Sequence, residues 1–158
     1  MRLVLLPLGL AAFGLASLAG CSAFGPDGPP TSDSSTALPA LEWGSSFGMC
    51  VGYCDARLDV SPAGIATLTE VGTRQPDLAP RVRTRALTAS ESARLVAASE
   101  ASTVRTGTLG CPDCADGGAE YVERGGARVT FEFGGDAGAA APLAEALRGV
   151  RETFPRLN

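Results

Sequence analysis

Histidine and lysine are both absent from this sequence of 158 residues, in which all thirteen basic residues are arginine. Without histidine, the chain lacks the usual general base near neutral pH, and with it the Ser-His-Asp and Cys-His types of catalysis. Most transition-metal sites also use histidine. The sequence contains no P-loop, no G-x-G-x-x-G and no G-x-S-x-G motif. We therefore expect no catalytic residues, no cofactor and no metal site, and an enzymatic activity has no support.

Positive charge is also scarce, because the formal net charge is −4 and the pI is about 4.8. Proteins that bind nucleic acid need a clustered basic surface, so nucleic acid is excluded as a partner. Carboxylates are more numerous, but they form no recognisable acid/base pair. Asp113-x-x-Asp116 lacks the ligand series of an EF-hand loop, so a calcium site is not indicated either.

The N-terminus holds the one long apolar run. Arg2 is followed by apolar residues over 3–12, interrupted by Pro7 and Gly9, and the next residues are mostly Ala, Gly and Ser. A membrane-spanning helix needs about 20 predominantly apolar residues, which this run does not supply. A short charged start, an apolar stretch and a small-residue cleavage site are typical of a signal peptide. We assign residues 1–20 to such a peptide.

The segment Leu18-Ala19-Gly20-Cys21 resembles the lipobox of bacterial prolipoproteins. The resemblance implies diacylglyceryl transfer to the Cys21 thiol, cleavage before Cys21 and a further acyl chain, such as palmitate, on the new amino group. Each buried CH₂ contributes about 0.8 kcal/mol, so several chains anchor stably. Because Ser22 and not Asp follows, the resemblance implies the outer membrane where the organism has one. The alternative is an ordinary secretory signal with an accidental cysteine.

The mature chain divides into a tether and one domain. Residues 21–40 are mostly Ser, Pro, Gly, Asp, Thr and Ala, with little to bury, and we expect a flexible lipidated tether there. Residues 41–158 are enough for one hydrophobic core and too few for two. We therefore expect a single domain, carried outside the cytoplasm on a bacterial membrane.

Four cysteines remain once Cys21 is lipidated, and they form two close pairs, Cys50-x-x-x-Cys54 and Cys111-x-x-Cys114. An exported domain meets an oxidising compartment, so an even number of thiols predicts two disulfides. We favour the local bridges. Crossed pairing would close a loop of about 60 residues and restrict the unfolded chain more, so it stays open as an alternative.

Two other roles for these cysteines compete with structural disulfides. A C-x-x-C pair at a helix N-terminus can have an exchange-competent thiol, but Asp113 and Asp116 oppose a thiolate and Gly117-Gly118 oppose a helix. Four cysteines can also bind zinc, although export favours oxidation over thiolate ligation. Structural disulfides are the preferred interpretation.

The run Cys50-Val51-Gly52-Tyr53-Cys54, with the strand and glycine-containing turn that follow, resembles a family of uncharacterised bacterial domains that carry C-x-G-x-C before a β-hairpin. Those domains usually place proline after the second cysteine and an aromatic residue two positions later, where this chain has Asp55 and Arg57. The family has no established activity, so the resemblance implies a hairpin and no function.

Alternating and helical patterns predict an α+β domain. The expected strands start at 41 and lie at 55–60, 65–71, 81–87, 119–124 and 127–133, and the expected helices lie at 89–101 and 140–154. Thr88 and Glu91 form a capping box before the first helix. Gly125-Gly126 predicts a tight hairpin turn. We expect Phe133 on the buried face, and a small antiparallel sheet packed against two helices and braced by disulfides.

Three arginines, Arg81, Arg83 and Arg85, alternate along one predicted strand and share one face of it. Guanidinium groups bind phosphate and carboxylate, so these residues are candidates for binding anions, including lipid head groups. Charged edge strands also prevent unwanted strand pairing, and a solvated edge is the preferred interpretation.

These observations lead to one expected function and one competitor. We expect a non-enzymatic envelope lipoprotein, held at the membrane by its N-terminal lipid, whose disulfide-braced domain is a binding or structural module for an envelope protein. The competing hypothesis is an envelope thiol-disulfide oxidoreductase that uses Cys111 and Cys114.

Overall fold

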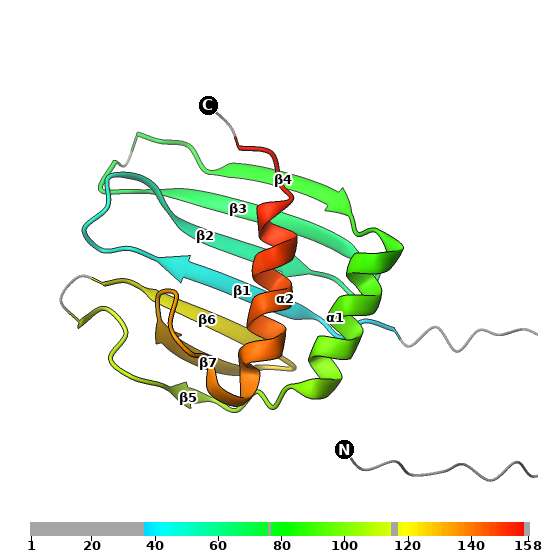
Figure 1. The fold of residues 1–158 in the computed structure, drawn as a ribbon. Coiled ribbons are helices and arrows are strands. Elements are labelled where there is room, and N and C mark those ends of the chain that lie inside the picture. Colours follow the sequence, from blue (N-terminus) through cyan, green and yellow to red (C-terminus); the bar gives the residue numbers. More distant parts are fainter. Residues whose placement is uncertain (1–36, 76, 115–116, 157–158) are drawn as a thin grey trace, which may run out of the picture. The chain divides into compact units, whose positions relative to one another are not determined.

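The computed structural model describes residues 37–75, 77–114 and 117–156, and within them a seven-stranded sheet carries both α-helices on one face (Figure 1). The strand order is β4-β3-β2-β1-β6-β7-β5. The elements are β1 (Leu41–Ser46), β2 (Gly52–Val60), β3 (Ile65–Thr73), β4 (Arg81–Ala86), α1 (Ala89–Ala101), β5 (Gly107–Thr108), β6 (Ala119–Arg124), β7 (Ala127–Glu132), the short 3₁₀ helix η2 (Gly138–Ala140) and α2 (Ala141–Glu152). The predicted α+β fold with two helices is confirmed. The predicted signal peptide lies outside the described residues.

The sheet differs from the expected one at an edge. All pairings from β4 to β7 are antiparallel, but β5 pairs with β7 in parallel, with Gly107 opposite Val129. The sheet is therefore mixed and larger than predicted. A strand of two residues is too short to show a period in the sequence, which is why it was not predicted.

The β6–β7 hairpin forms around the predicted turn. Gly125 and Gly126 both have positive φ, at 60° and 81°, as a tight hairpin turn requires. Val122 pairs with Val129, so an apolar pair lies on the buried face. The prediction for Phe133 was wrong. β7 ends at Glu132, and the Phe133 side chain beyond it is 45% exposed.

The two helices are positioned by local signals in the sequence. α1 begins after the predicted capping box, in which the Glu91 N–H donates to the Thr88 hydroxyl at 3.2 Å and the Thr88 N–H donates to the Glu91 carboxylate at 2.8 Å. α2 has Pro142 in its first turn, where a missing N–H costs no hydrogen bond. Its apolar stripe is buried, and it comprises Leu143, Leu147, Val150 and, just beyond the helix, Phe154.

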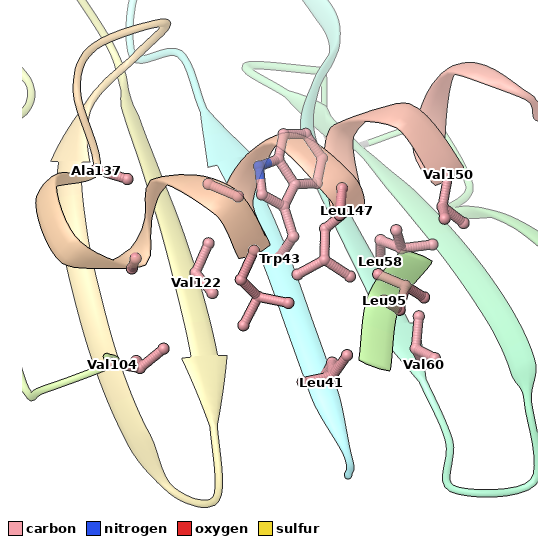
Figure 2. Packing of buried hydrophobic residues seen from close by; sticks show 14 of the residues in the cluster. Leu41, Trp43, Leu58, Val60, Leu95, Val104, Val122, Ala137, Leu147 and Val150 are labelled. Carbon is pink, nitrogen blue, oxygen red and sulfur yellow. The ribbon is translucent and has the colours of Figure 1, made fainter. Parts of the chain in front are cut away.

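The core fills the space between the sheet and the helices. Alternate residues of the strands point to this side, because successive side chains of a strand face opposite ways. Figure 2 shows Trp43 of β1 and Leu147 of α2 inside this layer. Leu38, which precedes β1, also belongs to the core. The largest fully buried side chains are Phe131, Leu58, Leu68, Leu95, Leu143, Leu147, Val60 and Val122.

The opposite face of the sheet carries a polar network centred on Glu42. Its carboxylate accepts a hydrogen bond from the Tyr121 hydroxyl at 2.6 Å and forms ion pairs with Arg57 at 3.0 Å and Arg128 at 3.1 Å. Burial, and then the hydrogen bond to Glu42, raise the pKa of Tyr121. The Tyr121 ring lies against Gly44, whose lack of a Cβ makes room for it. Arg128 stacks over the ring, 4.0 Å from its centre.

We predict that Gly44→Ala destabilises the domain, because a Cβ at this position collides with the Tyr121 ring. Overpacking of this kind costs about 1–3 kcal/mol. Urea denaturation of the mature chain should show this loss. Gly48→Ala is the matched control, since a Cβ there meets no atom within 4 Å and the stability should be nearly unchanged. Equal stability of the two variants would contradict the role given to Tyr121.

Candidate functional site

The structure brings the four predicted cysteines together as two local pairs. The Cα atoms of Cys50 and Cys54 are 5.8 Å apart, and those of Cys111 and Cys114 are 5.4 Å apart, both within the range of disulfides. The favoured local pairing is therefore confirmed. The first bridge spans the end of the β1–β2 connection, and the second lies in the β5–β6 connection.

The Cys111–Cys114 pair closes a tight turn. Asp113 has a positive φ of 62°, and the Cys114 N–H donates to the Cys111 carbonyl at 3.1 Å. The Cys111 N–H donates to the Glu132 carboxylate at 3.0 Å. A reactive thiolate needs electropositive surroundings, such as the N-terminus of a helix, and these contacts do not provide them. The geometry is that of a bridge that holds a loop, and the oxidoreductase hypothesis stays a prediction.

Both bridges lie at one end of the sheet. At this end the rings of Phe47 and Phe133 meet edge to face, with their centres 4.4 Å apart. The Phe133 N–H donates to the Gly118 carbonyl at 3.2 Å, which joins the β5–β6 connection to the end of β7. We call residues 47–54, 109–114 and 133 the disulfide end.

The disulfide end exposes apolar side chains from more than one connection. Val51 is 64% exposed and Phe133 is 45% exposed, and Met49 and Leu109 are exposed as well. This group was not predicted from the sequence, although Phe47, Met49 and Val51 lie close together in a loop that has few polar residues. Exposed apolar side chains that gather on a surface mark an interaction site more often than isolated ones do.

The described chain enters the sheet at the end opposite the disulfide end. Leu41, the first residue of β1, pairs with Val60 and Arg124, whereas the last residue, Ser46, pairs with Ala119 beside the disulfide loops. In Figure 1 the first described residues enter at the right and the two disulfide connections lie at the left. The disulfide end therefore points away from the place where the chain enters.

The three arginines of β4 face the helices and not a solvated edge. The Arg83 guanidinium pairs with Glu70 at 2.6 Å and also donates to the Pro155 carbonyl. The Arg85 guanidinium pairs with Glu91 at 2.7 Å. Alternation along β4 predicted their shared face, but only the packing of the helices decides that this face is covered. Anion binding by Arg81, Arg83 and Arg85 stays a prediction, and the side chain of Arg81 stacks on the Tyr53 ring at 3.9 Å.

Residues 37–75, 77–114 and 117–156 contain neither a metal-ligand cluster nor a membrane-spanning helix. No three His, Cys, Asp or Glu side chains in these ranges converge as metal ligands do. No helix in them combines the length and the apolar character that crossing a bilayer requires.

We predict that Glu91 contributes stability that depends on pH. The hydrogen bond from Arg85, assisted by those from Thr88, lowers the pKa of Glu91 from its ordinary value of 4.5 to about 2. The folded state therefore gains stability from the ionised carboxylate above pH 4.5 and loses it as the pH falls towards 2. Glu91→Gln should lower the free energy of unfolding at pH 7 by about 1–3 kcal/mol and flatten its fall at acidic pH. Denaturation at several pH values tests this.

Glu100→Gln, at an exposed position of the same helix, is the control for this experiment and should keep the wild-type profile. An identical acid profile in the wild type and in Glu91→Gln would show that the contact with Arg85 contributes nothing.

Comparison with known proteins adds no relative. No protein-family model matches the sequence, and no curated protein matches it either. What this domain does therefore has to be inferred from its own residues.

Proposed function

We propose that this chain is a bacterial envelope lipoprotein, anchored through lipid on Cys21, whose domain binds a protein partner at the disulfide end. The lipobox resemblance of Leu18-Ala19-Gly20-Cys21 supports the anchor. The low-complexity run that follows Cys21 supplies a tether between the lipid and the domain, and this tether ends before Leu38, whose side chain is part of the core. The anchor and the tether together hold the domain near a membrane surface.

The observation that carries the binding function is a braced apolar surface that faces away from the chain entry. Val51 and Phe133 expose large apolar areas on connections that two disulfide pairs and the Phe47 contact hold in place. Binding residues commonly lie on loops that a rigid scaffold positions. A surface held rigid before binding also loses less conformational entropy when a partner binds.

The polar face of the sheet is less suited to a partner. Its central charges are already paired around Glu42, and Arg57 and Arg128 share that carboxylate. A partner that bound here would have to desolvate or break these ion pairs. The free energy of desolvation can exceed what new contacts with the partner would gain. The disulfide end has less of this cost, because its large exposed side chains are apolar and Asp113 is its one charged residue.

The anchor predicts a definite result for Cys21→Ser. The wild-type chain should fractionate with membranes and incorporate an alkyne-labelled palmitate, because Cys21 carries the diacylglyceryl group. Cys21→Ser should lose the label and leave the lipid-anchored fraction. The double variant Cys50→Ser and Cys54→Ser is the control and should keep the label. A wild-type chain that takes up no label and is released as soluble protein would contradict the lipoprotein assignment.

Photocrosslinking in living cells tests the binding surface. A photoreactive phenylalanine analogue at Val51 should give a discrete heavier adduct, because this side chain lies within the proposed interface. The same analogue at Ile65 is the matched control, since Ile65 is 38% exposed and begins β3 at the opposite end of the sheet. Adducts of equal yield from both positions, or none from Val51, would exclude the disulfide end as the binding surface.

A further inference from the structure

The chain leading from α1 through β5 is exposed although it lies beside the core. Residues 105–110 are all exposed, whereas Val104 just before them is buried. β5 occupies one edge of the sheet and pairs with β7 on one side only. The Leu109 N–H donates to the Thr130 carbonyl of β7 at 2.8 Å. Backbone groups alternate in direction along a strand, so Thr108 directs its N–H and C=O away from the sheet.

A groove of about 490 Å³ runs beside this edge. Its apolar walls come from β7, from the segment around η2 and from the end of β5: Val129, Ala137, Ala139, Ala140 and Leu109. A Cβ placed on Gly107 would meet no atom within 4 Å, so the space next to the strand is open. Volumes of this size are typical of sites that hold ligand groups, and the walls suit aliphatic side chains.

One positively charged side chain, Arg105, lies at the rim of the groove. Arg105 is among the residues that line it and is exposed. Within the part of the chain that the structure describes, Arg105 takes part in none of the ion pairs. In a chain with a net charge of −4, an arginine without a carboxylate partner beside an apolar groove complements an acidic group on a ligand.

The exposed segment is held at both ends. On one side the Thr103 N–H donates to the Ala139 carbonyl at 2.9 Å. On the other side the Cys111 N–H donates to the Glu132 carboxylate at 3.0 Å, and the Cys111–Cys114 bridge closes the turn. The edge is therefore fixed before any partner arrives, which lowers the entropic cost of binding. This arrangement gives the second disulfide a role in positioning β5.

We propose that β5 receives an extended peptide segment of the partner protein as an added strand. The peptide pairs with the outward backbone groups of Thr108, its apolar side chains enter the groove, and an acidic side chain pairs with Arg105. In strand addition, main-chain hydrogen bonds supply affinity and side-chain pockets supply specificity. This inference rests on the proposed binding function and names the chemistry of its partner. Leu109 links the groove to the disulfide end.

The test begins with a displayed library of random peptides, selected on the full mature chain. The selected peptides should share apolar residues at alternate positions and an acidic residue. A synthetic copy of the best one then serves as the probe in a fluorescence binding assay. Selection of no common pattern, or of a basic one, would overturn the proposal.

Three variants of the chain separate the parts of the site. Thr108→Pro removes the outward N–H and should weaken binding of the probe about tenfold or more. Ala139→Trp fills the groove from an exposed position and should weaken binding similarly. Arg105→Gln should weaken it about three- to fivefold, the usual size of an exposed ion pair. Circular dichroism and Tm confirm that each variant is folded.

Thr84→Pro on β4, the opposite edge of the sheet, is the matched control and should bind the probe like the wild type. An equal loss in Thr84→Pro and Thr108→Pro would show that the effect is not specific to β5. Binding that is sensitive to Ala139→Trp but not to Thr108→Pro would show occupation of the groove without strand addition. If Val51 still crosslinks a partner while Thr108→Pro changes nothing, the proposed function stands and this inference fails.

Discussion

Burial of one face of the sheet beneath α1 and α2 is the constraint on which the rest of the domain depends. Leu58 and Leu68 of the sheet and Leu143 and Leu147 of α2 are almost completely buried in this layer. Each such side chain contributes about 1.5–3 kcal/mol relative to an exposed one. Because neighbouring residues of a strand face opposite ways, covering one face also decides which side chains stay in water. The polar network around Glu42 occupies the face that remains.

The covered face also contains charges, and several of them form ion pairs between the sheet and the helices. Glu120, only 4% exposed in its side chain, pairs with Arg148 of α2, and Arg85 of β4 pairs with Glu91 of α1. An unpaired buried charge is costly, so these pairs restrict where each helix can lie on the sheet. The helices cover one face of the sheet, and the ion pairs around Glu42 occupy the opposite face. The surfaces that remain available to a partner are the ends and edges of the sheet. There the disulfide end and the groove beside β5 expose apolar side chains.

Local features of the sequence predicted much of this fold. The capping box of Thr88 and Glu91 located α1, and Gly125-Gly126 located a hairpin with its register, because both signals act over a few residues. Features that depend on distant contacts were not predictable. The partial burial of Arg85 follows from the position of α2, and β5 exists only because β7 lies beside it. Phe133 leaves the core because its strand ends one residue earlier than predicted.

Hydrogen exchange, measured by mass spectrometry on the lipidated chain, tests most directly whether the domain is a membrane-held binding module. The protein is compared in isolated envelope membranes and after purification in detergent. The account predicts that amides of residues 105–111 and of the disulfide end exchange slowly in membranes and faster once the partner is lost, while those of β1 are unchanged. Identical exchange in both preparations would contradict it.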